Sequence, residues 1–375
     1  MAIQVVIIFP YGGLKNSVEE AVFHEMVFRC LGVLGTPPII VIESQAQKKA
    51  QEKAQEKASS CYKILDTFAQ GVIIQHHVWS VDTCQRWLDG WGYIIDNSQD
   101  SEISRVVLLP GDTEQIGHLN LNQLTGVVEN PDVMDALSSA IIQENFHYPS
   151  NVGGLKESTI KKLNSYLESV HDFLQKITDF LLVDRNHQDL PIVIGDFSTG
   201  SDMSSKDLID RYGTLPLIAN WFPDTFENLL KIPELDRPQN LGLSKPRSEF
   251  LNIDIQTLKI LLGYKPFAYE QTLNMVVRWC EQQKQSNGIY KFTLGELQDD
   301  NSFREYRNCI DQIERTERML KYVWRELNEP KQENYSNYED YKDAYSEFMR
   351  NYAAYDRNST AIRQSANIIL EKILV

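Results

Sequence analysis

The sequence predicts an α/β protein whose largely parallel sheet is flanked by helices and followed by a helical C-terminal region. Three observations support this prediction: short β-branched runs, helical spacings between them, and a polar helical stretch near the end. The first four strand signals alternate with helix signals, which is the pattern of βαβ units with right-handed crossovers. We expect a core region over residues 1–300 and a helical region over residues 301–375.

The first strand signal is the clearest in the chain. The run Ile3–Phe9 is almost continuously apolar, as expected of a strand buried on both faces, and Pro10 ends it. Further strands are expected at 39–42, 72–75 and 106–109, and helices at 18–34, 45–58 and 80–95. The helix at 45–58 is rich in Lys, Glu, Gln and Ala, so we interpret it as solvent-exposed.

Beyond residue 110 the regular alternation of strand and helix signals ends. Helices are expected at 157–182, 204–211, 255–262 and 269–283, and strands at 192–194, 249–253 and, as an edge strand, 289–293. From Ser302 onward the chain is expected to be helical and polar, over 303–327, a tyrosine-rich stretch 335–355, and 361–374. Several tyrosines lie three or four positions apart and so share one helix face. We expect these helices to pack on the core or to form a homo-oligomer with a second copy.

Composition excludes several classes of protein. The net charge of −15 argues against nucleic-acid binding, which requires a basic face. The five cysteines are scattered and form no C-x-x-C pair, which fits a reducing, cytoplasmic compartment and gives no zinc signature. The chain begins with a strand signal and shows no stretch of about 20 apolar residues, so we expect neither a signal peptide nor a transmembrane segment.

The strongest candidate for chemistry is the acidic turn Gly111-Asp112-Thr113-Glu114, directly after the fourth strand signal. Carboxylate oxygens suit a hard cation, so Asp112 and Glu114 are candidate ligands for Mg2+ or Mn2+. Such a metal stabilises a diphosphate leaving group. The alternative is a turn in which Asp112 only accepts hydrogen bonds from nearby backbone N–H groups.

Other candidates lie where the earlier strands end. In α/β sheets, ligands bind outside the carboxyl ends of the strands. Pro10 and Tyr11 follow the first strand, and Glu43 follows the second, where its carboxylate would accept hydrogen bonds from a base or a ribose. A solvated strand end is the alternative for Glu43. Lys206, in a charged helix, would bind a phosphate or a carboxylate, or belong only to a solvated helix face.

A further group of charged residues is expected on the acceptor side of the site. Arg247 would hold an anionic group in bidentate fashion. Glu249 or Glu270 would act as a general base toward a hydroxyl group. A buried Arg–Glu ion pair between the segment around Arg247 and the segment around Glu270 explains these residues equally well. No nucleophile elbow, P-loop or G-x-G-x-x-G motif is present in the chain.

Taken together, this layout resembles the GT-A glycosyltransferases over roughly residues 1–295. In that family the first strand ends near a Pro, the second ends in an acidic residue that touches the nucleoside, and the fourth ends in a D-x-D-type metal motif. Pro10, Glu43 and the pair Asp112/Glu114 match these positions. The segment 192–223 resembles the acceptor side of mannosylglycerate synthase-like enzymes. The departures are an Asp-Thr-Glu metal motif and the absence of any histidine after His187, where the family often supplies a late metal ligand.

The resemblance implies a GT-A-like, Rossmann-type mixed sheet and a metal-assisted transfer of a sugar from a nucleotide sugar to a small or polymeric hydroxyl acceptor. Two alternatives stay open. A nucleotidyltransferase would use a Gly-rich loop after the first strand, of which Gly12-Gly13-Leu14-Lys15 is a short version. A catalytically silent relative would serve as a binding or scaffolding protein, which the altered metal motif and the tyrosine-rich helices favour.

Overall fold

The computed structural model covers the whole chain. It describes residues 2–9, 14, 16–43, 48, 52, 73–76, 90–96, 103–111, 121, 124, 127–183, 190–198, 205–235, 237–240, 242–264, 271–283, 288–297 and 306–374. Most of the expected helix at 45–58 lies outside these residues, although Lys48 and Glu52 are helical.

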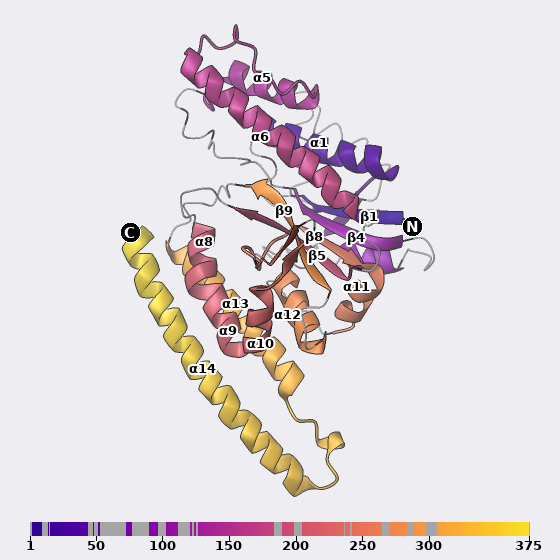
Figure 1. Cartoon of the computed structure of the whole chain (residues 1–375), viewed down its shortest axis with the longest axis vertical. Helices are drawn as coiled ribbons and strands as arrows, with labels where there is room; N and C mark the ends of the chain where they lie inside the picture. The colour runs from indigo at the N-terminus through magenta and orange to yellow at the C-terminus, as the bar shows by residue number, and fades with distance from the viewer. Residues whose placement is uncertain are drawn as a thin grey trace.

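One mixed β-sheet lies at the centre of the molecule (Figure 1). In the described residues it has nine strands in the order β3-β2-β1-β4-β8-β5-β9-β6-β7. The strands are β1 (Ala2–Ile8), β2 (Ile39–Glu43), β3 (Ile73–His76), β4 (Ile103–Pro110), β5 (Ile192–Ser198), β6 (Pro233–Glu234), β7 (Arg237–Asn240), β8 (Leu251–Asp254) and β9 (Ile289–Glu296). β1 to β4 are mutually parallel, β8 is antiparallel to both β4 and β5, and β9 is parallel to β5.

The strands alternate their side chains between two hydrophobic cores. Val5, Ile7 and Phe9 point into one core, and Val6 and Ile8 point into the other. All five side chains are buried, and each contributes roughly 1.5–3 kcal/mol by leaving water. Burial on both faces explains why the strand reads as a continuous apolar run.

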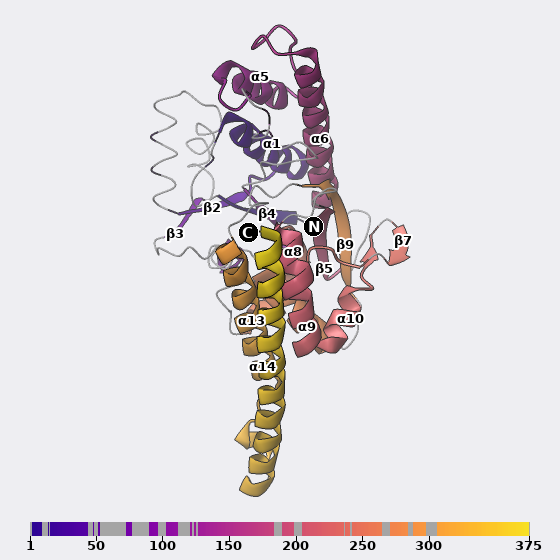
Figure 2. The ribbon, with the colours of Figure 1, turned by 90° about the vertical axis from the view of Figure 1, so that its left-hand side faces the viewer.

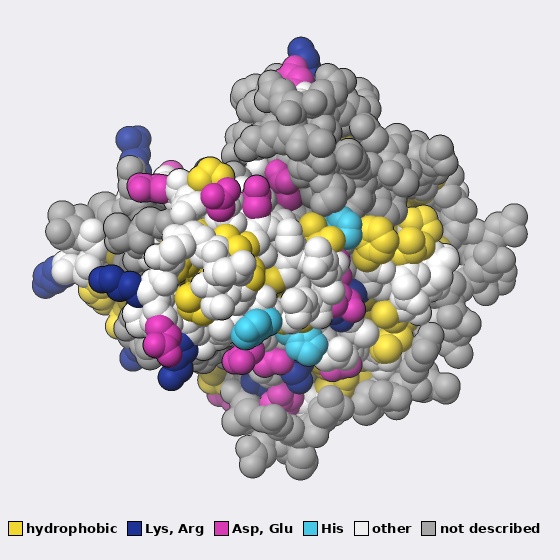
Figure 3. All heavy atoms as spheres, turned by 90° about the horizontal axis from the view of Figure 1, so that it is seen from above, with side chains coloured by type: hydrophobic (Ala, Val, Ile, Leu, Met, Phe, Trp, Pro, Cys, Tyr) yellow, Lys and Arg dark blue, Asp and Glu magenta, His cyan; other side chains and the backbone are white. Residues whose placement is uncertain are grey.

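Three helices cover one face of the sheet (Figure 1): α1 (Ser17–Leu34), α5 (Pro131–Ile142) and α6 (Glu157–Leu181). α1 begins where the Asn16 side chain accepts hydrogen bonds from the backbone N–H groups of Val18 and Glu19, both at 3.0 Å. It ends at Gly35, which has a left-handed φ of 71°. Seen from the α5–α6 end (Figure 3), hydrophobic, acidic and basic side chains are interspersed over the described part of the surface.

The other face carries the remaining helices (Figure 1). They are α8 (Ser205–Ile209), the π-helical turn η2 (Asp210–Thr214), α9 (Leu215–Trp221), α10 (Pro223–Leu229), α11 (Ile255–Leu262), α12 (Gln271–Gln283), α13 (Tyr306–Asn328), the 3-10 turn η3 (Gln332–Asn334) and α14 (Tyr338–Leu374). Among the described helices, none is both long enough and apolar enough to span a bilayer.

α13 and α14 form an antiparallel hairpin that projects beyond the rest of the molecule (Figures 1 and 2). An aromatic cluster joins the hairpin to α9. The Trp221 ring lies 5.7 Å from the Trp324 ring and 5.5 Å from the Tyr355 ring, measured between centroids. Trp324 also stacks on Phe348 at 5.3 Å. Of the tyrosines noted in the sequence, Tyr345, Tyr352 and Tyr355 therefore lie on the inner face of α14, whereas Tyr338 is exposed.

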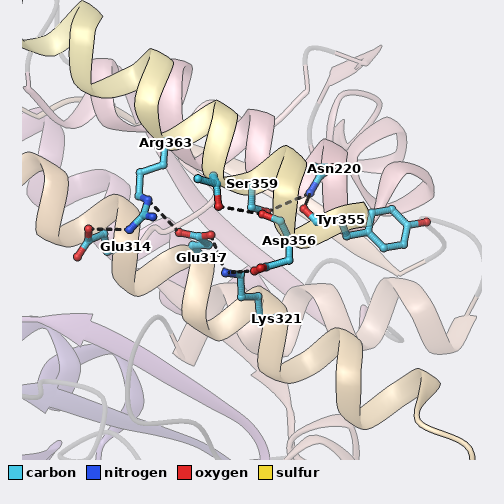
Figure 4. A network of polar contacts seen from close by, with 9 residues as sticks. Asn220, Glu314, Glu317, Lys321, Tyr355, Asp356, Ser359 and Arg363 are labelled. Atoms are coloured by element: carbon cyan, nitrogen blue, oxygen red, sulfur yellow. Dashed lines mark hydrogen bonds and ion pairs between the residues drawn. The ribbon is translucent and has the colours of Figure 1, made fainter. Parts of the chain in front are cut away.

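Polar contacts also hold α14 in place (Figure 4). Arg363 bonds to Glu314 at 2.9 Å and lies 3.5 Å from Glu317, both in α13. Lys321 pairs with Glu317 of its own helix and with Asp356 of α14. On the α9 side, Asn220 donates hydrogen bonds to the Tyr355 carbonyl and the Ser359 hydroxyl of α14.

Several elements differ from the sequence-based expectations, and α9, α10, β6 and β7 were not predicted. α14 is one continuous helix, where two were expected, because no Pro or Gly interrupts residues 338–374. β9 is an internal strand and not an edge strand, because β5 and β6 pair on its two sides. α5 was not predicted, although Asn130 and Pro131 form a capped start for it. The expected oligomerisation through the C-terminal helices stays a prediction.

Candidate functional site

The strand order defines one place on the sheet where a ligand can enter. β1 lies between β2 and β4, so the chain winds outward in one direction through β2 and β3 and then reverses to β4. In open α/β sheets the binding crevice lies outside the carboxyl ends of the strands at this switch point. The switch point here is the pair β1 and β4, whose last paired residues are Ile8 and Pro110.

Gly111 turns the chain at this switch point. Its backbone N–H donates a hydrogen bond to the carbonyl oxygen of Ile8 at 2.9 Å. A Cβ atom at residue 111 would overlap that oxygen and lie 3.3 Å from the Phe23 ring. The residue after β4 must therefore be glycine for the chain to cross the end of β1 so closely.

Glu43 lies at the same edge. It is the last residue of β2 and pairs with His76 of β3 in the parallel register. Neighbouring strands are about 4.8 Å apart, so the backbone at Glu43 lies roughly 10 Å from the end of β4, two strands away. Five of the candidate residues, namely Pro10, Tyr11, Asp112, Glu114 and Glu270, lie outside the described residues.

The reversed strand β8 adds a second segment to this edge. Because β8 is antiparallel, its first residue, Leu251, lies where β4 and β5 end, paired with Leu108 and Ile194. Glu249 precedes Leu251 by two residues, and Pro110 follows Leu108 by two. Glu249 and Pro110 therefore both lie just beyond the last residues that pair β8 with β4, at the same edge of the sheet. The Glu249 side chain is half-buried.

Asp196 anchors the loop that leads into β8. It lies in β5, is 3% exposed, and accepts hydrogen bonds from the backbone N–H groups of Ser244 and Lys245 at 3.1 and 2.9 Å. The ammonium of Lys291, on β9, lies 3.5 Å from the same carboxylate. The Ser248 hydroxyl donates to the Gly195 carbonyl at 2.5 Å. The loop 242–250 is therefore fixed at both ends against β5.

Two ion pairs, one partly and one fully buried, cross from this loop to the helical segment α8–η2. Lys245 pairs with Asp207, and Arg247 Nε donates to Asp210 Oδ1 at 2.7 Å. Basic residues two apart in a turn thus match acidic residues three apart on one helix face. Lys206, the candidate next to Asp207, is in α8, and its side chain is outside the described part.

The acidic partner Asp210 opens the π-helical turn η2. π-helical turns are rare and are found frequently at functional sites. Asp210 is 2% exposed, and its Oδ2 atom has no hydrogen-bond partner in the described part of the chain, as is also true of Thr214 Oγ1. Buried atoms of this kind are uncommon in folded proteins and often mark bound water or a functional role.

Arg247 was predicted from the sequence as a candidate, but its ion pair with Asp210 was not. The alternative of an Arg–Glu ion pair with the segment around Glu270 stays a prediction, because Glu270 lies outside the described residues. Lys245, Lys291 and Gln312 were not predicted. The sequence signal for the two ion pairs was a pair of spacings, Lys245-x-Arg247 and Asp207-x-x-Asp210. Within the described residues, no group of three or more His, Cys, Asp or Glu side chains is arranged to hold a metal ion.

No family model matches this chain. No curated protein matches its sequence either. The observed mixed sheet, with helices on both faces and a C-terminal helical region, confirms the predicted α/β class and the predicted C-terminal helical region.

Among solved structures, the chain is similar to glucosyl-3-phosphoglycerate synthase from Mycobacterium tuberculosis. The complex of that enzyme with uridine diphosphate is 11% identical, with a TM-score of 0.45 over 86% of this chain and 80% of that chain. A second structure of the enzyme is 10% identical with a TM-score of 0.45, over 86% and 80%. Its complex with Mn2+, uridine-diphosphate-glucose and phosphoglyceric acid is 9% identical with a TM-score of 0.45, over 86% and 79%.

Proposed function

We propose that this protein is a glycosyltransferase that moves a sugar from a nucleotide sugar to a hydroxyl acceptor with the help of a divalent metal ion. One observation carries the proposal: the end of β1, the glycine turn after β4 and the loop before β8 lie at the same edge of the sheet, on neighbouring strands. The β1–β4 half, which would bind the nucleotide, is thereby adjacent to the β5–β8 half, which carries the candidate base Glu249.

The β1–β4 side would hold the donor. Glu43, at the end of β2, would accept hydrogen bonds from the nucleoside, and Pro10 and Tyr11 would line its binding site. Asp112 and Glu114, which follow Gly111 in the sequence, would hold Mg2+ or Mn2+. Their carboxylate oxygens fit such a cation, which supplies stabilisation of the diphosphate as it leaves.

The β5–β8 side would hold the acceptor. Glu249, or Glu270, would take the proton of the acceptor hydroxyl as its oxygen bonds to the sugar carbon. The bond from that carbon to the diphosphate breaks, and the nucleoside diphosphate leaves. Lys206 would bind an anionic group of the acceptor. Arg247 already uses two of its nitrogens on Asp210 and Gln312, so it would act mainly by holding the loop that carries Glu249.

The proposal is tested by calorimetric titration of a panel of UDP-, GDP- and ADP-sugars against the full chain in the presence of Mn2+. We expect one class to bind, and Asp112→Ala to weaken its binding at least tenfold, which corresponds to 1.4 kcal/mol. Asp172→Ala, which changes an exposed carboxylate on α6, is the matched control and should bind like the wild type.

Two outcomes would overturn the proposal. One is the absence of binding to every sugar nucleotide. The other is equal binding by the wild type and by Asp112→Ala. Release of pyrophosphate from a nucleoside triphosphate would instead identify a nucleotidyltransferase.

A further inference from the structure

We infer that Gln312 of helix α13 is a positioning residue of the site, and that α13 completes the acceptor half of the site. This inference rests on the proposed function, because it concerns the loop that carries the candidate base Glu249.

The first observation is a hydrogen bond that joins distant parts of the chain. Arg247 Nη1 donates to Gln312 Oε1 at 3.0 Å, while Nε of the same guanidinium donates to Asp210 at 2.7 Å. Arg247 is 8% exposed. Because a guanidinium is planar and rigid, two acceptors on two of its nitrogens fix both its position and its orientation.

The second observation is the close packing of α13 against the π-helical turn. A Cβ atom at Gly213 would lie 2.5 Å from Cγ1 of Ile313, the residue next to Gln312. Only glycine at this position leaves room for the Ile313 side chain where it packs. The first turns of α13 are therefore fixed against η2, and Gln312 is held where it meets Arg247.

The third observation connects Arg247 to Glu249. Arg247 and Glu249 flank Ser248, whose hydroxyl bonds to the Gly195 carbonyl and whose backbone N–H bonds to the Lys245 carbonyl at 3.0 Å. A shift of the Arg247 side chain is therefore transmitted to a short, tightly held loop. Displacing a catalytic group by about 1 Å can lower a rate on the order of a hundredfold.

The test compares Gln312→Ala with Gln312→Glu, which keeps an oxygen acceptor for Arg247. Gln364→Ala, an exposed glutamine on α14, is the matched control. The assay follows hydrolysis of the sugar nucleotide that binds best, so no acceptor needs to be known. Water donates its oxygen to the sugar carbon and its proton to Glu249, and the nucleoside diphosphate leaves.

We expect Gln312→Ala to slow the release of nucleoside diphosphate about tenfold, with a donor Kd within twofold of the wild type. Gln312→Glu and Gln364→Ala should retain the wild-type rate. The inference is overturned if Gln312→Ala retains the wild-type rate, if Gln312→Glu is as slow as Gln312→Ala, or if the donor Kd weakens as much as the rate falls.

A second measurement does not depend on activity. Amide hydrogen exchange, followed by mass spectrometry, should become at least tenfold faster in residues 245–250 of Gln312→Ala, with no change in β1 and β4. Unchanged exchange in that loop overturns the inference. If the wild type binds no sugar nucleotide, the proposed function has failed, and the exchange data alone then decide whether α13 positions the loop.

Discussion

Gly111 and Ile8 are joined across the switch point by an N–H to carbonyl hydrogen bond of 2.9 Å. This contact holds the first residue after β4 against the end of β1. The acidic pair Asp112 and Glu114 begins one residue later in the sequence. The glycine therefore fixes where the chain leaves the sheet at this edge.

Gly111→Ala should destabilise the fold, because the new methyl group overlaps the Ile8 carbonyl and must displace the backbone. Overpacking of this kind costs about 1–3 kcal/mol. The free energy of unfolding, measured by urea denaturation, checks the prediction. Gly32→Ala is the control, because a Cβ atom there has nothing within 4 Å and alanine favours the helix by about 0.5–1 kcal/mol. Equal stability of the two variants would contradict the prediction.

Arg247 and Asp210 should show strong energetic coupling. Both are buried, at 8% and 2% exposure, so removing either partner leaves an uncompensated charge and costs roughly 3–5 kcal/mol. Arg247→Met and Asp210→Leu are each expected to lower the free energy of unfolding by that amount. The double variant should lose much less than the sum, because it leaves no charge behind. A double-mutant cycle measures this, and additive losses would show that the pair is not coupled.

The aromatic cluster should anchor α14 more strongly than the polar contacts do. Trp324 is 8% exposed and contacts Trp221, Phe348 and Tyr355, so Trp324→Ala is expected to cost about 3–5 kcal/mol. Arg363→Ala removes the pair with Glu314, in which both side chains are about one-third exposed, while the buried Glu317 keeps its pair with Lys321, so the variant should cost only about 0.2–1 kcal/mol. Thermal denaturation of both variants checks this order. A larger loss of stability in Arg363→Ala than in Trp324→Ala would contradict the prediction.

Lys321 should make the stability of the hairpin fall at alkaline pH. Burial lowers its pKa, but hydrogen bonds and charges from Asp356 and Glu317 together outweigh burial, so the pKa is raised above 10.5. A raised pKa stabilises the folded state below pH 10.5, and this stabilisation is lost as the pH rises through the folded-state pKa. Urea denaturation between pH 8 and 11.5 should show that the free energy of unfolding falls less with rising pH in Lys321→Met than in the wild type. Superimposable curves would exclude this role.

Much of the β1–β4 half could be predicted from the sequence. Its strands are buried on both faces, so Ile3–Phe9 appears as a continuous apolar run that ends at Pro10. Parallel strands also end at one edge, which is why Glu43 and the turn at Gly111 were expected to lie close together. Side-chain positions at Asp112 and Glu114 remain a prediction.

The β5–β8 half could not be predicted in the same way. The direction of β8 depends on tertiary contacts such as the buried Arg105, whose guanidinium bonds to the side chain and carbonyl of Asn252. The pairing of Arg247 with Asp210 and Gln312 joins residues 37 and 65 positions apart, and local spacing carries no information about such distances. An isolated arginine in a sequence does not reveal whether it faces a ligand or another part of its own chain.

The hydrogen bond between Arg247 and Gln312 has a consequence for the order of events during protein synthesis. Gln312 follows Arg247 by 65 residues, so the ribosome releases the whole sheet edge before it releases the residue that steadies the guanidinium. A nascent chain can therefore form the β1–β4 half, and the contacts that hold loop 242–250 against β5, before α13 is complete. The Arg247 guanidinium gains its hydrogen bond to Gln312 only when α13 docks.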